Sequence, residues 1–131
     1  MISLRNSLPK KFNDSELLLR AVLPRPNYWR NGRLSSAALK DKYGLSVDRT
    51  YTRTLNDSIQ YMKNHLSGSI VSFTISDCHS VSAVVKYMPS LTNKYHCEIH
   101  GSADRVLLDT DQAHELACRA IIQFSVNIST T

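Results

Sequence analysis

The heptapeptide YHCEIHG places two histidines and a glutamate at every second position. Side chains alternate between the two faces of a β-strand, so we expect His96, Glu98 and His100 to share one face. Cys97 and Ile99 would then share the other face and point toward a core. Imidazole nitrogens and a carboxylate can bind a divalent metal, and a glutamate can also act as a general base.

A metal site would need help from another part of the chain. Residues two apart on a strand are about 6–7 Å apart at the backbone, so two of these side chains could converge on one ion. Cys78 or His79 could supply a third ligand, but no established zinc spacing is present. The alternative is an exposed polar face with Glu98 paired to a histidine. We predict no metal site, and we take His96 and Glu98 as candidate catalytic residues.

Arg20 interrupts the apolar stretch of SELLLRAVLP and is the third candidate catalytic residue. A guanidinium on a buried strand needs a partner, because burying a charge alone is costly. One interpretation is a salt bridge to Glu98, Asp48 or Asp77. The other is a bidentate contact with a phosphate or carboxylate of a ligand.

The segment GRLSSAALKDKYGLSVDR supplies candidate ligand-binding residues. Ser35 and Ser36 stand at the start of an expected short helix, where backbone N–H groups, hydroxyls and Arg33 could bind an anion. Simple helix capping is the alternative. Asp48 and Arg49 follow a short predicted strand, and they could either line a site or pair with neighbours.

Aromatic residues lie among arginines in the loop PRPNYWRNGR. Tyr28 and Trp29 could stack on bases while Arg25, Arg30 and Arg33 contact phosphates. The alternative is that Trp29 anchors the loop to the core. No helix-turn-helix, zinc-finger, Walker, dinucleotide-binding or nucleophile-elbow motif is present to narrow the chemistry.

Hydrophobic periodicity predicts the elements that must position these residues. We expect a buried strand over 17–23, a short helix in SSAALKDK ended by Gly44, and a strand over 45–47. A helix is expected over 54–66, with an apolar stripe formed by Leu55, Ile59, Met62 and Leu66. Strands over 69–75 and 81–88 are expected to form an antiparallel hairpin, followed by a third strand in YHCEIHG. A last helix begins at Asp109 or Thr110 and extends to Phe124.

This order predicts a single compact α+β domain, with a mostly antiparallel sheet, two main helices and one short helix. We expect a flexible N-terminal arm over 1–13, the domain over 14–126 and a frayed tail over 127–131. A chain of 131 residues fits one domain.

Composition indicates a cytoplasmic protein with an anionic partner. The three cysteines form no C-x-x-C pair, and no apolar run is long enough to cross a bilayer. Residues 1–63 hold 12 Lys/Arg and 5 Asp/Glu, whereas residues 64–131 hold 4 and 6. The basic half suggests a nucleotide, nucleic acid or acidic protein as partner, although a solvated surface would have the same charge.

Several motifs together resemble a known pattern. LLLRAVLP, W-x-N-G-R-L-S-S-A-A-L-K-D, G-L-S-V-D-R and H-C-E-I-H-G resemble the pattern of a family of small uncharacterised bacterial proteins. That resemblance covers the chain from Leu17 to Gly101.

The chain is also similar to ADP-ribosyltransferase-like domains, including the toxins called RES domains. This similarity implies that Arg20 holds the NAD phosphates, that Ser46 supports the nicotinamide ribose and that Glu98 stabilises an oxocarbenium-like state. NAD is the cofactor that the resemblance implies, while the residues themselves specify none. The chain departs from this pattern in one respect. It has His96, and not a second glutamate, two residues before Glu98.

The sequence therefore predicts that a polar cleft binds an anionic, nucleotide-like ligand, and it leaves open whether the protein is an enzyme. If it is, Arg20 clamps phosphate, Glu98 polarises a ribose hydroxyl or a water, and His96 shuttles a proton. One alternative is a non-enzymatic subunit or regulator of a bacterial defence or toxin module, which binds nucleic acid or an acidic protein. The other is a metal-dependent hydrolase.

Overall fold

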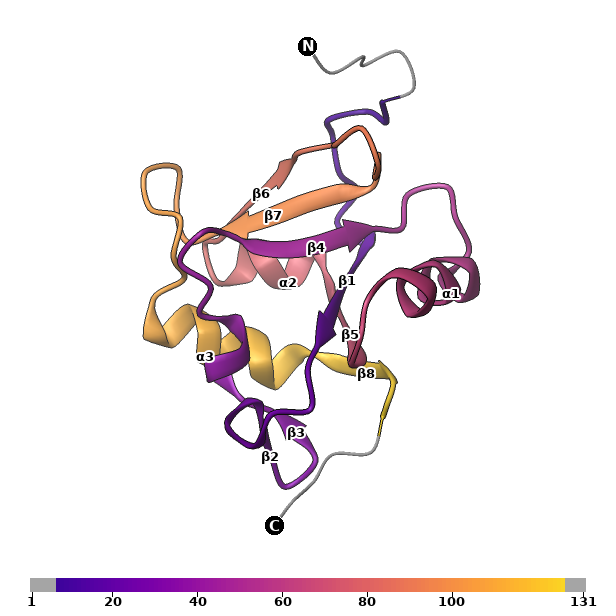
Figure 1. The fold of residues 1–131 in the computed structure, drawn as a ribbon. Helices are drawn as coiled ribbons and strands as arrows, with labels where there is room; N and C mark the ends of the chain where they lie inside the picture. The colour runs from indigo at the N-terminus through magenta and orange to yellow at the C-terminus, as the bar shows by residue number, and fades with distance from the viewer. Residues whose placement is uncertain (1–6, 127–131) are drawn as a thin grey trace.

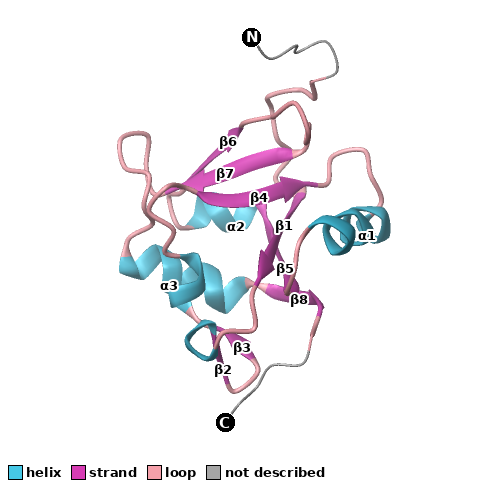
Figure 2. Cartoon of the chain, viewed as in Figure 1, coloured by secondary structure: helices cyan, strands magenta, loops and turns pink. Residues whose placement is uncertain are grey.

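A six-stranded antiparallel sheet organises the computed structural model, which describes residues 7–126 (Figures 1 and 2). The strand order is β6-β7-β4-β1-β5-β8. The strands are β1 Leu17–Val22, β4 Leu45–Arg49, β5 Ser69–Thr74, β6 Val84–Tyr87, β7 His96–His100 and β8 Ile121–Phe124. The predicted α+β domain with a mostly antiparallel sheet is confirmed.

Three α-helices accompany the sheet, and two of them are long. They are α1 Leu55–His65, α2 Ile75–Ser80 and α3 Thr110–Arg119. Two 3₁₀ turns, η1 Pro26–Tyr28 and η2 Ser36–Leu39, flank a small hairpin of β2 Trp29–Arg30 and β3 Arg33–Leu34. The predicted short helix of SSAALKDK is therefore a single 3₁₀ turn. None of the helices in residues 7–126 has the length and apolar character needed to span a bilayer.

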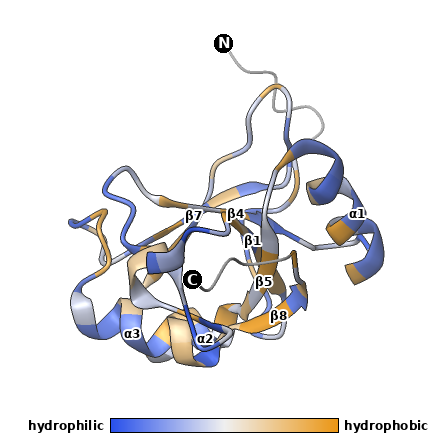
Figure 3. Ribbon diagram, turned by 60° about the horizontal axis from the view of Figure 1, so that its bottom comes forward, coloured by the Kyte–Doolittle hydropathy of each residue, from blue (hydrophilic) through white to orange (hydrophobic). Residues whose placement is uncertain are grey.

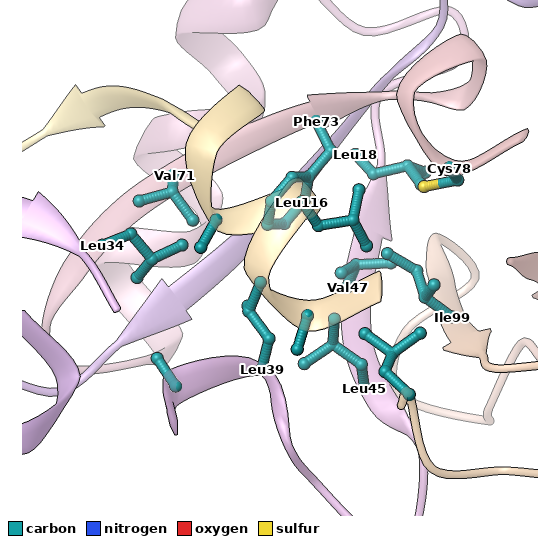
Figure 4. Close-up of a cluster of buried hydrophobic side chains, with 14 of the residues drawn as sticks. Leu18, Leu34, Leu39, Leu45, Val47, Val71, Phe73, Cys78, Ile99 and Leu116 are labelled. Atoms are coloured by element: carbon teal, nitrogen blue, oxygen red, sulfur yellow. The ribbon is translucent and has the colours of Figure 1, made fainter. Parts of the chain in front are cut away.

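The two faces of the sheet carry separate cores, because neighbouring residues of β1 point in opposite directions. Leu18 joins the larger core, which includes Phe73 and Leu116 and which α2, α3 and η2 cover (Figure 4). Leu19 joins a smaller core with Met62 of α1 on the other face. Leu18 and Leu19 are both fully buried, so both faces of β1 are covered at this point.

The helix predicted over 54–66 is confirmed as α1. Thr54 caps it, since its hydroxyl accepts a hydrogen bond from the N–H of Asp57 at 3.0 Å. Ile59 and Met62 pack toward the smaller core, whereas Leu66, the last residue of the predicted stripe, is 53% exposed. α1 therefore packs on the sheet through Ile59 and Met62, and an opening lies beside Met62 and the residues that follow α1.

The hairpin predicted between 69–75 and 81–88 is wrong. The chain enters α2 after Thr74, where Thr74 and Asp77 cap each other through backbone bonds of 2.9 Å in each direction. This helix carries the chain away from β5, and the shortened strand β6 pairs with β7 at the far edge of the sheet. Both faces of β5 are buried, whereas the alternating pattern predicted one buried side.

The last helix is shorter than predicted. It begins after the Asp109 cap, as expected, but it ends at Arg119. Ile121 and Ile122 are part of β8, the strand that pairs with β5 and closes the other edge of the sheet. These two isoleucines are 60% and 41% exposed, and β8 is coloured as hydrophobic in Figure 3.

The joint between β1 and β4 is the feature of the sheet that shapes the candidate site. Only two residue pairs, Leu18 with Arg49 and Leu19 with Asp48, are in register across it. In Figure 1, β4 runs at a steep angle to β1 and meets it only near the start of β1, so β1 and β4 separate beyond Leu19. An opening therefore lies beside the second half of β1, where Arg20 is located.

The predicted arm is described only in part. Residues 1–6 and the predicted tail over 127–131 lie outside the described residues. Within the described part, the backbone N–H of Leu8 donates to the Tyr87 hydroxyl at 2.8 Å, and Phe12 packs against the larger core. Residues 7–13 are therefore held against the domain by specific contacts.

Candidate functional site

A cleft lies between α1 and the face of the sheet formed by β1 and β4, and we call it the β4–α1 cleft. Its volume is about 500 Å³. The residues that line it are Arg20, Ala21, Leu23, Ser46, Val47, Asp48, Met62, Leu66, Ser67, Asn93 and His96. Four of the predicted site residues, Arg20, Ser46, Asp48 and His96, are thus brought together from three strands or their ends.

Arg20 fills the opening between β1 and β4. Its Nη1 donates to the backbone carbonyl of Ser46 at 3.0 Å, and its Nη2 donates to the carbonyl of Ala38 at 3.4 Å. The first carbonyl belongs to β4 and the second to η2, so Arg20 joins β1 to both elements. The side chain lines the β4–α1 cleft and also a shallower hollow beside Lys40 and Asp41, so it spans the split in the sheet.

The charge of Arg20 has no ion-pair partner among residues 7–126. None of Glu98, Asp48 and Asp77, the partners considered for a salt bridge, is paired with it. Burial lowers the pKa of Arg20, and the negative charge of Asp41 opposes this only in part. Its Nε is buried without a hydrogen-bond acceptor in the described structure. The guanidinium remains a cation at neutral pH, so the cleft contains an unneutralised positive charge.

Asp48 forms the polar end of the cleft, where its two oxygens have different partners. Oδ1 accepts from the side-chain amide of Asn93 at 2.9 Å, and Oδ2 lies 3.9 Å from Nη2 of Arg53. The Arg53 guanidinium stacks on Tyr95, with 3.5 Å between its carbon and the ring centroid. Asp48 is only 5% exposed, so these contacts fix its orientation at the cleft wall.

The polar face of β7 continues from the cleft wall. His96 is opposite Asp48, and Glu98 is opposite Ser46, in the β4–β7 register. Glu98 joins the two histidines, since its Oε1 lies 2.8 Å from Nε2 of His100 and its Oε2 lies 3.7 Å from Nε2 of His96. The predicted alternation is confirmed, and Glu98 has histidine partners on both sides.

Gly44 allows Glu98 to take this position. Its φ of +108° suits glycine, and a Cβ there would lie 2.2 Å from Oε1 of Glu98. The carboxylate therefore occupies the space that a side chain at residue 44 would need. The bend before β4 and the pairing of Glu98 with His100 depend on the same glycine.

The connection after β5 supplies no additional metal ligand to the two histidines and the glutamate of β7. Cys78 is fully buried in the larger core, and His79 is exposed on α2 at 3.6 Å from Asp14. Among residues 7–126, there is no group of three or more His, Cys, Asp or Glu side chains able to hold a metal ion. Cys97 and Ile99 are both fully buried, as predicted.

Arg49 lies on the opposite face of β4 from Asp48, outside the cleft. Its side chain is fully buried and forms a two-point ion pair with Glu16, with N–O distances of 2.8 and 2.9 Å. Its remaining donors bond to the backbone carbonyls of Pro9 and Lys11. Burial opposes its charge, but the hydrogen bond to Glu16 and the charge of Glu16 raise the pKa of Arg49. Through these contacts Arg49 joins β4 to Glu16 and to the backbone of residues 9 and 11.

The other predicted ligand-binding residues line a separate hollow next to α3. Arg33, Ser35 and Ser36 contribute to it together with His114 and Cys118. The Ser35 hydroxyl accepts from the N–H of Ala37 at 3.2 Å and caps η2, which fits the capping interpretation. These residues therefore do not share the β4–α1 cleft with Arg20.

Trp29 has a structural position. Its ring is 6% exposed in the larger core, and its Nε1 donates to the carbonyl of Leu23 at 3.0 Å. This position matches the interpretation in which Trp29 anchors the loop. Tyr28 remains half-buried, with the Arg25 guanidinium 5.6 Å from its ring centroid.

Two polar residues of the cleft region, Asn93 and Arg53, were not among the predicted site residues. Asn93 lies in the loop before β7, where asparagine is a common turn residue, and only its bond to Asp48 distinguishes it. Arg53 is distant from Tyr95 in the sequence, so their stacking follows from the strand pairing alone. Met62 of α1 and Leu66, which follows α1, complete the cleft, and both belong to the apolar stripe predicted over 54–66.

Comparison of the chain with protein-family models, curated protein sequences and solved structures gave no match.

Proposed function

We propose that the β4–α1 cleft binds a small anionic, nucleotide-like ligand. The observation that carries this proposal is Arg20, a half-buried guanidinium that lines the cleft with no ion-pair partner among the described residues. Burying such a cation is costly unless an anion compensates it. A phosphate or carboxylate of a ligand would supply that compensation.

The walls of the cleft suit a ligand with one apolar part and one charged part. The lining includes the apolar residues Leu23, Met62 and Leu66 and the polar residues Ser46, Asp48 and Asn93. A volume of about 500 Å³ is within the usual range for small-molecule sites. A nucleotide would place its base or ribose against the apolar residues and its phosphates near Arg20.

The polar face of β7 suggests a route to catalysis. Glu98 does not line the cleft itself, but it pairs in register with Ser46, whose backbone carbonyl accepts from Arg20, and it lies beside His96, which does line the cleft. In an NAD-handling reaction, Arg20 would hold phosphate and Glu98 would polarise a ribose hydroxyl or a water. His96, at the junction of the cleft and this face, would carry the proton.

Titration calorimetry with ADP-ribose, NAD and adenosine tests the proposal. We expect ADP-ribose and NAD to bind below millimolar concentration, and neutral adenosine to bind at least about tenfold more weakly. Arg20→Met should weaken ADP-ribose binding by about 10- to 100-fold, the effect of losing hydrogen bonds to a charged group, and should leave adenosine binding unchanged.

Arg33→Met is the matched control, because it removes the same charge from the hollow next to α3. It should not change ADP-ribose binding. Since Arg20 also joins β1 to β4, the melting temperature of each variant shows whether the fold persists. The proposal fails if no anionic ligand binds at millimolar concentration, or if Arg33→Met weakens binding as much as Arg20→Met does.

Exposed basic and aromatic residues in the segment 25–43 favour nucleic-acid binding as a second candidate function. Tyr43 is 80% exposed, and the Lys42 amine lies 5.5 Å from its ring centroid. Arg25 and Tyr28 form a similar pair. Aromatic faces beside cations can stack on single-stranded bases and contact phosphates.

Fluorescence anisotropy with a labelled single-stranded oligonucleotide tests this second function. We expect affinity to fall steeply as salt is raised, and Tyr43→Ala to weaken binding by about 1–3 kcal/mol. Tyr51→Ala is the control, since Tyr51 is partly exposed but stacks on Arg49. Binding that is insensitive to Tyr43→Ala would rule out this surface.

A further inference from the structure

The hollow next to α3 holds a cysteine and a histidine side by side. We call it the α3 hollow, and its lining consists of Arg30, Asn31, Arg33, Leu34, Ser35, Ser36, His114, Ala117 and Cys118. One turn of α3 separates His114 from Cys118, and the distance from Nε2 to Sγ is 3.8 Å. Cys118 is exposed, so its sulfur is accessible to a reagent in the hollow.

The charges around this pair favour an anionic reagent. Arg30 and Arg33 are directly opposite each other in the β2–β3 register, an arrangement of like charges that is unfavourable without an anion nearby. Neither arginine has an ion-pair partner within the described structure. The lining of the hollow includes two arginines and a histidine but no carboxylate. Its volume of about 570 Å³ accommodates a small molecule.

The other two cysteines provide a contrast within the same chain. Cys78 and Cys97 are fully buried, and burial raises the pKa of each thiol to about 12. The thiolate is the reactive form of cysteine, so these two residues are protected both by burial and by protonation. Reactivity toward disulfides should therefore be confined to Cys118.

We propose that Cys118 is a site of mixed-disulfide formation with small anionic disulfides of the glutathione class. His114 accepts the thiol proton, and the Cys118 thiolate attacks one sulfur of the disulfide. A bond forms between Cys118 and that sulfur while the original sulfur–sulfur bond breaks. The departing thiolate takes up a proton and leaves as a free thiol. Cys118 is thus oxidised, half of the reagent is reduced, and Arg30 and Arg33 hold the carboxylates of the bound half.

The test compares three disulfides of different charge on the full-length protein. Oxidised glutathione is the anionic probe of the hollow, hydroxyethyl disulfide the neutral probe and cystamine the cationic probe. The rate at which each one modifies the protein is measured. Each rate is divided by the rate of an unstructured peptide that contains Cys118, which removes the intrinsic reactivity of the reagent. We expect the ratio for oxidised glutathione to exceed that for cystamine by about tenfold or more at low salt, and the difference to shrink as salt is raised.

Four variants separate the roles of the residues. Arg30→Ala/Arg33→Ala should abolish the preference for the anionic disulfide, whereas the matched control Arg25→Ala/Lys42→Ala, which removes the same charge outside the hollow, should retain it. His114→Gln should slow all three reagents by a similar factor, because it affects the proton rather than the reagent's charge. Cys118→Ser should abolish modification of the folded protein.

Mass spectrometry of proteolytic peptides locates the modified cysteine. The proposal is overturned if Cys118 shows no preference between the anionic and cationic disulfides. It is also overturned if both double variants have the same effect, or if the folded protein is modified at Cys78 or Cys97.

Discussion

Replacing Arg49 by methionine should lower the free energy of unfolding by about 3–5 kcal/mol, because the variant leaves the carboxylate of Glu16 buried without its partner. Arg49 is fully buried, and its guanidinium lies 4.3 Å from the ring centroid of Phe12 and 5.1 Å from that of Tyr87. It also bonds to the backbone of residues 9 and 11. Losing it should therefore release the described part of the predicted arm as well as destabilise β4.

Urea denaturation of a double-mutant cycle measures this effect. We expect Glu16→Leu combined with Arg49→Met to recover part of the loss, since the pair of apolar residues leaves no unpaired charge. Arg33→Met provides the control for removing an exposed arginine and should change stability by less than about 0.5 kcal/mol. A loss below 1 kcal/mol for Arg49→Met would contradict the structural role given to this residue.

Replacing Gly68 by alanine should cost about 3 kcal/mol or more, because strain and collision act together at this position. The φ of Gly68 is +109°, and a Cβ there would lie 2.3 Å from the carbonyl oxygen of Val22. That oxygen belongs to the backbone at the end of β1, so it cannot move without shifting the strand. The expected consequence is a loss of pairing between β1 and the start of β5.

Gly32→Ala separates the two contributions. Gly32 also has a positive φ, of +75°, but nothing lies within 4 Å of the position of its Cβ. Its substitution should cost only the conformational strain, about 1 kcal/mol. The difference between the two variants in urea denaturation is the cost of the collision together with the added strain of the larger φ at Gly68. Equal losses at the two glycines would show that the contact with Val22 does not constrain β1.

The sequence predicted the local features of the fold well, because these depend on neighbouring residues. The alternation of β7, the amphipathic stripe of α1 and the α+β class all appear in the structure. The pairing of β6 could not be predicted in the same way. The capping pair Thr74 and Asp77 turns the chain into α2, and the partner of β6 is then chosen by tertiary packing rather than by proximity in sequence.

The candidate site was predictable in its residue types and only partly in its grouping. Arg20 and His96 line one cleft because β1 and β7 flank β4, an order that no local pattern specifies. Arg33 and the two serines were assigned to the same ligand, but the docking of α3 encloses them in a different hollow. Arg49 was predicted to bind the ligand. Its partner Glu16 is 33 residues away in the sequence, so no local pattern indicated their ion pair.

The β4–α1 cleft and the α3 hollow are formed by different residues, so they can be tested with different variants. The β4–α1 cleft depends on Arg20 and the joint between β1 and β4, whereas the α3 hollow depends on a helix that packs on the other face of the sheet. The two sites have no lining residue in common, and their one link is the bond from Arg20 to the carbonyl of Ala38 in η2. Arg33→Met and Arg20→Met can each serve as the control for the other site.

The most direct test of the β4–α1 cleft is the NMR spectrum of the histidine side chains during a titration with ADP-ribose. The chain has five histidines, and among them only His96 lines the cleft, while His79 is on α2 and His114 is in the α3 hollow. We predict that the imidazole signals of His96 shift with saturation as ADP-ribose is added, and that those of His79 and His114 stay in place. Binding of ADP-ribose that leaves His96 unchanged, or that shifts His114 instead, would contradict the assignment of the ligand to this cleft.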